Sequence, residues 1–137
     1  ALGDAYRNMP GREGDADTSY EKAIELAEAY LQVNVDDAYT LAVLAHYLAA
    51  VGRFDQAASR LARAKELAPE NMYVHYYAAL IAATGGDTAE AIDASRRAME
   101  NGYPGRFLAA DSGLQSLADS EIFRELVTSD TGQRADN

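Results

Sequence analysis

A helical hairpin over residues 38–71 is the feature that most constrains the fold. Its first half places apolar residues at positions i, i+3, i+4 and i+7, the spacing of one helix face, and these residues are Leu41, Leu44, Ala45 and Leu48. Its second half repeats that spacing with Ala57, Leu61, Ala64 and Ala68. Gly52 suits the left-handed cap that ends a helix, and Pro69 cannot continue one. The sequence therefore predicts two antiparallel helices that meet through small residues.

The same pattern recurs with a period of about 34 residues, which is typical of stacked helix pairs. Moving forward by this period takes Gly52 to Gly86 and Ala57 to Ala91, and moving back takes Ala57 to Ala23. Alanine-rich helices are common, so a single copy would be weak evidence, but three copies in phase are strong evidence. The recurrence predicts an all-α array of antiparallel helix pairs.

These residues resemble the tetratricopeptide repeat (TPR) family, whose pattern is W-x2-L-G-x2-Y, then A-x3-F-x2-A, then P. The middle repeat reads Leu41-x2-Leu44-Ala45-x2-Leu48, then Ala57-x3-Leu61-x2-Ala64, then Pro69. The resemblance covers residues 1–105, and it implies a right-handed superhelix of helix pairs, or solenoid. Such solenoids need atypical terminal elements to cover their last apolar face.

We expect one domain made of five segments: repeat 1 at 1–37, repeat 2 at 38–71, repeat 3 at 72–105, capping helices at 106–128 and a frayed polar tail at 129–137. Repeat 1 lacks the turn of helix that should precede Leu2, so the chain is expected to be a fragment of a longer protein. Its second helix should begin between Glu13 and Asp17, after a turn at Pro10–Gly11, and should run to Val33.

The helix ends carry polar residues that are expected to act as N-caps, namely Asp36 or Asp37, Glu70 or Asn71, Asp87, Asp111 and Asp119. Pro104 should start a short helix. The apolar residues expected to cover the last hairpin are Leu114, Leu117, Ile122, Phe123 and Leu126. Ser95 stands where a large apolar residue is expected, so this hairpin should pack less tightly.

A narrower resemblance rests on Leu2-Gly3-Asp4-Ala5-Tyr6-Arg7, on the Pro-Gly-Arg insertion and on the Gly-Tyr-Pro ending followed by two Asp motifs. It is similar to the C-terminal TPR regions of bacterial multidomain regulators, which follow kinase, nucleotide-cyclase or winged-helix DNA-binding modules. The proline that this family places after each Asp is replaced here by Ser112 and Ser120.

The charge balance narrows the class of partner. The chain has 22 acidic and 12 basic residues, a net charge of −10, which argues against nucleic acid and anionic membranes. A basic or neutral protein or peptide is a more natural partner. The longest apolar run, 38–51, is shorter than the about 20 residues that span a bilayer. Cysteine is absent and no signal peptide is visible, but a chain that begins with Ala1 could have lost one, so the compartment stays open with the cytoplasm favoured.

No catalytic constellation is visible, so we expect no enzyme, no cofactor and no metal. His46 and His75 lie in different repeats, no cysteine nucleophile exists, and no G-x-S-x-G elbow or phosphate loop occurs. Asp15-x-Asp17-x-Ser19 lacks the glycine and glutamate that a calcium loop requires. This motif is better explained as acidic residues at a helix N-terminus, where the helix dipole favours negative charge.

The resemblance implies a concave groove lined by the first helix of each repeat. Its groove positions fall on Asp4, Arg7 and Asn8 in repeat 1, on Tyr39, Ala42, His46, Ala49 and Ala50 in repeat 2, and on Tyr73, Tyr76, Leu80, Ala83 and Thr84 in repeat 3. The candidate partner-binding residues among them are Arg7, Asn8, Tyr39, His46, Tyr73 and Tyr76. Tyrosine suits recognition because it offers a large contact area and a hydroxyl. The alternative for these rings is packing between helices, which we favour for Tyr77.

A structural role is the other open interpretation: a spacer or self-association element with no groove ligand. The truncated first helix would leave Leu2, Tyr6 and the packing face of Ile24 and Ala27 partly open. Exposed apolar surface of that kind often pairs with a second copy, which would make a homodimer.

Overall fold

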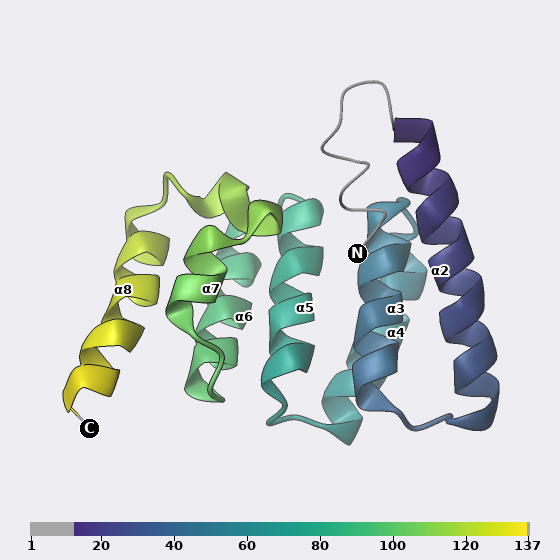
Figure 1. Ribbon diagram of the computed structural model, residues 1–137, viewed down its shortest axis with the longest axis horizontal. Helices are drawn as coiled ribbons and strands as arrows, with labels where there is room; N and C mark the ends of the chain where they lie inside the picture. Colours follow the sequence, from purple (N-terminus) through teal and green to yellow (C-terminus); the bar gives the residue numbers. More distant parts are fainter. Residues whose placement is uncertain (1–12, 137) are drawn as a thin grey trace. The chain divides into compact units, whose positions relative to one another are not determined.

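The computed structural model describes residues 13–136, and these residues form helices joined by short connections (Figure 1). The helices are α2 (Glu13–Val33), α3 (Ala38–Ala50), α4 (Phe54–Leu67), α5 (Met72–Thr84), α6 (Thr88–Glu100), α7 (Gly105–Ala110), the 3₁₀ helix η1 (Ser112–Leu117) and α8 (Glu121–Asp136). No strand occurs between residues 13 and 136, which confirms the all-α class. The chain divides into two compact units, Ala1–Leu67 and Ala68–Asn137.

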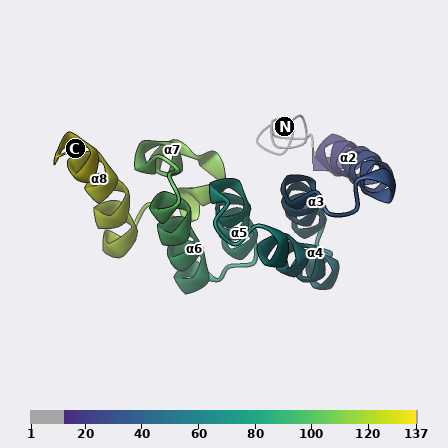
Figure 2. The same ribbon diagram turned by 90° about the horizontal axis from the view of Figure 1, so that it is seen from below.

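The first unit is built on α3, which packs against α2 on one side and α4 on the other (Figure 2). Its core is formed by Tyr20, Ile24 and Leu31 from α2, by Leu41, Leu44 and Leu48 from α3, and by Ala57 and Ala64 from α4. Ala57 and Ala64 are completely buried, as the repeat pattern predicts for the contact between the two helices. The predicted limits of α2 and of the hairpin are also confirmed.

Glycines with positive φ end α3 and α5 in the same way. Gly52 has a φ of 86° and Gly86, one repeat length further on, has a φ of 80°. After each glycine a backbone N–H reaches back into the helix: Arg53 donates to the Leu48 carbonyl at 2.8 Å, and Asp87 donates to the Ala82 carbonyl at 2.9 Å. This is the Schellman arrangement, which satisfies carbonyls at the helix end.

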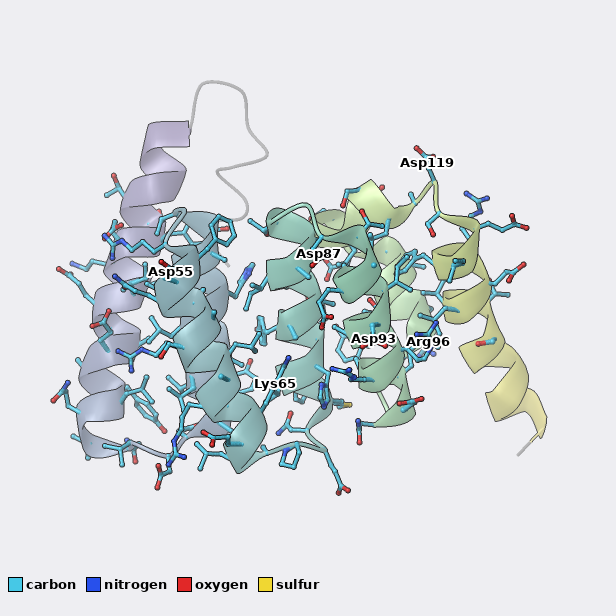
Figure 3. The ribbon with its side chains drawn as sticks, turned by 180° about the vertical axis from the view of Figure 1, so that it is seen from behind. Asp55, Lys65, Asp87, Asp93, Arg96 and Asp119 are labelled. Atoms are coloured by element: carbon cyan, nitrogen blue, oxygen red, sulfur yellow. The ribbon has the colours of Figure 1, made fainter. Side chains whose placement is uncertain are left out.

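Side-chain caps begin most of the helices. Asp37 accepts from the Thr40 N–H at 3.2 Å and Asn71 accepts from the Tyr73 N–H at 2.8 Å. Asp87, at the start of α6 in Figure 3, accepts from the Glu90 N–H at 3.1 Å. The Thr40 N–H, followed by the Tyr30 hydroxyl, lowers the pKa of Asp37 because both hydrogen bonds favour its charged form.

The predicted cap at Asp119 is wrong, because Ser120 performs that role. The Ser120 hydroxyl oxygen accepts from the Phe123 N–H at 3.2 Å, while Asp119 precedes the helix (Figure 3). Asp111 does cap η1, since its carboxylate accepts from the Gly113 N–H at 2.8 Å.

In the second unit α5 packs against α6, η1 lies against both, and α8 packs against α7 and α6. The capping segment contributes Leu108, Leu114, Leu117, Phe123 and Val127 to the core. The prediction for Ile122 is wrong, because this side chain is 61% exposed. Phe123 and Val127, four residues apart on one face of α8, point inward instead, and Leu126 is partly buried. α8 continues to Asp136, beyond the predicted end of the capping helices at residue 128.

Ser95 is completely buried in α6, where the family pattern has a large apolar residue. Its hydroxyl donates to the Ala91 carbonyl at 2.8 Å, so the buried group is satisfied within its own helix. The opposite face of α6 is charged: Asp93 pairs with Arg97 at 2.7 Å and with Arg96 at 3.5 Å (Figure 3).

Candidate partner-binding surface

Tyr39 and Tyr73 occupy equivalent places in the two units, each as the second residue of its helix. Both follow an N-cap, Asp37 for α3 and Asn71 for α5, and the cap fixes the direction in which the first turn starts. The side chain of Tyr39 is 47% exposed and that of Tyr73 is 41% exposed. Large aromatic surface therefore remains accessible at two of the predicted groove positions.

Tyr76 is held by the chain itself. Its ring stacks on Tyr103, with centroids 4.7 Å apart and an angle of 14° between the planes, and its hydroxyl donates to the Asp111 carboxylate. Burial and this hydrogen bond to Asp111 raise the pKa of Tyr76 well above its usual value, since both disfavour the phenolate. Tyr76 is thus part of an internal contact as much as a surface residue.

The segment from Tyr103 to Leu117 covers the part of α5 that the resemblance assigns to the groove. Besides Tyr103 and Asp111 on Tyr76, η1 packs on α5. A Cβ added at Gly113 would lie only 2.7 Å from the Leu80 side chain, and Leu80 is buried. Two predicted groove positions of repeat 3, Tyr76 and Leu80, are therefore covered within the second unit by its own capping segment.

An aromatic cluster extends from α5 to α7. Tyr103 meets Tyr73 edge-on with centroids 6.3 Å apart, and it meets Phe107 edge-on at 6.0 Å. Phe107 is half exposed, and the Arg106 guanidinium lies 5.0 Å from its ring centroid. We call Tyr73, Tyr103 and Phe107 the aromatic patch. It combines exposed ring surface with a fixed support, because Tyr103 is stacked on Tyr76.

Tyr103 and Phe107 were not among the site residues predicted from sequence. The repeat pattern ends before them, so no groove position falls on them. The available signal was their aromatic type, because Tyr103 lies before α7 and Phe107 lies within it, so helical spacing does not place them on one face. The structure alone shows that Tyr103 contacts Tyr73 and Tyr76 on α5.

His46 lies in an aromatic contact within the first unit. Its ring centroid is 6.5 Å from that of the buried Tyr20 on α2 and 5.7 Å from that of Tyr47. His46 is only partly exposed, and Ala42 and Ala49, two other predicted groove positions on α3, are buried. Arg7 and Asn8 lie outside the described residues.

No protein-family model matches the sequence, and no curated protein or solved structure matches it either. Among the described residues no group of three or more His, Asp or Glu side chains is placed to hold a metal ion. None of the helices within 13–136 is long and apolar enough to cross a membrane. Function is therefore inferred from the chain's own geometry.

Proposed function

We propose that this chain is a non-catalytic protein-interaction module whose helix pairs are repeats of the tetratricopeptide type, in a right-handed solenoid. Support comes from the recurrence of both sequence and geometry. The capped starts at Asp37 and Asn71 and the Schellman ends at Gly52 and Gly86 are each one repeat length apart. In this proposal the chain serves a larger regulatory protein of the bacterial multidomain kind.

The exposed aromatic patch is the observation that carries the proposal. Tyrosine and phenylalanine that stay exposed on a rigid support are typical anchors of protein interfaces. Tyr73 and Phe107 fit this description, because both rings contact Tyr103 edge-on and Tyr103 is itself stacked on Tyr76. Tyr39 offers a second anchor in the first unit.

The partner is an uncharged or basic protein segment with apolar side chains. The chain's net charge of −10 repels acidic partners at long range and attracts basic ones. At the patch itself Arg106 already lies against Phe107, so the aromatic faces are best matched there by apolar groups of the partner.

The test is a quantitative pull-down with three variants of the chain. Tyr73→Ala with Phe107→Ala should lose the captured partners, because each anchor side chain typically contributes about 2 kcal/mol, or roughly thirtyfold in affinity. Tyr39→Ala should weaken the binding of the same partners by a smaller factor. Ile122→Ala removes an exposed apolar residue of the second unit outside the patch, so it serves as the matched control.

Circular dichroism should first show that all variants keep the helical content of the parent. Partners that are captured equally by the parent and by the Tyr73/Phe107 double variant would show that the patch is not the binding surface. Tyr76 is unsuitable for this experiment because its removal also breaks the contact with Tyr103 and Asp111.

A self-association role is the second candidate, and one observation favours it. Leu26, Tyr30 and Val33 follow a helical spacing along α2, and their side chains are exposed, Leu26 by 64% and Val33 by 83%. The packing face that was expected to stay open is instead closed at Ile24, which is buried. A second copy of the chain could cover the exposed residues.

Sedimentation equilibrium separates the two roles. Self-association predicts a dimer that dissociates when Leu26→Glu places a charge on this face of α2. Glu25→Gln, a neighbouring change on α2 that adds no charge, should leave the dimer intact. A monomer at every concentration up to the millimolar range would exclude this candidate.

A further inference from the structure

A cleft in the first unit shares no residue with the aromatic patch. It has a volume of about 490 Å³ and is lined by residues of α2, of the α2–α3 connection, of α3 and of α4. Small-molecule sites in proteins typically have volumes of roughly 300–1,000 Å³. Its size therefore suits a compact ligand.

One face of α4 supplies the polar side of the cleft. Gln56, Ser59, Arg60 and Arg63 line it, and their spacing of three, four and seven residues places them on the same side of the helix. Each of these side chains carries hydrogen-bond donors. The rest of the lining is mostly apolar, because it consists of Val35, Leu41 and one acidic residue, Glu28.

The two arginines differ in their partners. Arg63 is paired with Asp36 at 3.0 Å and with Glu66 at 3.6 Å, so its charge is compensated. Arg60 is partly buried, and within the described part of the chain no hydrogen bond or ion pair involves its guanidinium. Burial without a partner costs a charged group solvation, and a bound anion would restore it.

We propose that this cleft binds a small monocarboxylic acid with an apolar body. The Arg60 guanidinium would hold the carboxylate with two parallel hydrogen bonds, and the Ser59 hydroxyl and Gln56 amide would add donors beside it. Val35 and Leu41 would contact the apolar body. Glu28, the one acidic residue lining the cleft, disfavours a doubly charged ligand and can accept from an N–H on the acid.

N-acetyl-leucine is a probe with all of these features: one carboxylate, one N–H and a branched apolar side chain. Titrated into the full chain and followed by ¹H–¹⁵N NMR, it should give saturable shifts at the amides of Val35, Leu41 and Ser59. N-acetyl-leucinamide, which lacks the charge, should bind at least tenfold more weakly. Inorganic phosphate should also bind more weakly than the acid.

Two substitutions test the role of Arg60. Arg60→Gln should weaken the binding of N-acetyl-leucine at least tenfold. Arg60→Lys keeps the charge but not the planar guanidinium, so its affinity should lie between those of Arg60→Gln and the parent. Arg96→Gln on α6 (Figure 3), a surface arginine far along the sequence, is the control and should bind as the parent does. The dispersed spectrum of each variant shows that it is folded.

Equal shifts with the acid and its amide, or unchanged binding in Arg60→Gln, would overturn the proposal. Tighter binding of phosphate than of the acid would also overturn it, since the cleft would then be a general anion site. The absence of saturable shifts up to tens of millimolar would do the same. None of these outcomes bears on the aromatic patch, so this proposal and the proposed function fail separately.

Discussion

At the scale of single residues, the hydroxyl of Tyr76 joins two segments of the second unit that are distant in sequence. It donates to Asp111, and the Tyr76 ring stacks on Tyr103. Tyr76→Phe keeps the ring but removes the hydrogen bond to a charged acceptor. We expect it to lower the free energy of unfolding by about 1–3 kcal/mol, measured by urea denaturation followed by circular dichroism.

A double-mutant cycle with Asp111→Ala isolates this interaction, because Asp111 also caps η1 through Gly113. The two effects should be less than additive. Strict additivity would show that the hydroxyl and carboxylate contribute nothing jointly. The pKa of Tyr76 is raised in the folded chain. The stability that this hydroxyl contributes is therefore fully present below the pKa of an unfolded tyrosine, about 10, and is lost as the pH rises above that value. Tyr76→Phe should flatten this alkaline loss.

Residue-level properties were predictable from the sequence where they depend on local pattern. Ala57 and Ala64 are buried because helical spacing alone places them on the contact face. Tyr39 and Tyr73 are 47% and 41% exposed, and their assignment to a groove stays a prediction. The covering of Tyr76 could not be foreseen, since Tyr103 and Asp111 lie outside the repeat and meet α5 only through tertiary packing.

At the scale of the elements, the end of α5 offers two adjacent glycines with different backbone requirements. Gly86 has a φ of 80°, and no atom lies within 4 Å of where its Cβ would be, so a side chain there is opposed by the backbone alone. Gly85 has a φ of −82°, which any residue adopts. Gly86→Ala should destabilise by about 1 kcal/mol.

Gly85→Ala is its matched control and should be neutral or stabilise by up to about 1 kcal/mol, because it reduces only the entropy of the unfolded chain. Thermal denaturation of the two variants decides the matter. Equal melting temperatures for Gly85→Ala and Gly86→Ala would show that the Schellman turn adds no conformational constraint of its own.

The helices themselves were well predicted because caps, glycines and prolines mark their ends. The capping segment was predicted less well. Three inward residues, Leu114, Leu117 and Phe123, were predicted correctly, but Ile122 was wrong and Val127 was missed. Ile122 and Val127 both lie in α8, whose apolar residues form a single motif without periodic copies, and such a motif does not fix which face of the helix turns inward.

At the scale of the whole molecule, the chain forms two compact units, with residues 68–137 in the second. The repeat period predicts helix pairs, but it does not say where contacts become sparse along the chain. In the second unit only one hairpin, α5 with α6, carries the repeat pattern. The rest of its core comes from the segment that follows, through η1, α7 and α8.

Removal of everything after Asn101 should therefore unfold the second unit. The deletion takes away Leu108, Leu114, Leu117 and Phe123, all less than 5% exposed, together with the ring that stacks on Tyr76. Each such apolar side chain contributes about 1.5–3 kcal/mol on burial, so the loss is comparable with the about 5–15 kcal/mol by which a whole domain is stable.

Thermal denaturation and hydrogen exchange of the α5 and α6 amides measure this loss of stability. A second truncation after Ser129 keeps the buried Phe123 and Val127 of α8 and should leave the protection of the α5 and α6 amides unchanged. If the chain ending at Asn101 protects those amides as well as the longer one does, the capping segment contributes nothing to the core.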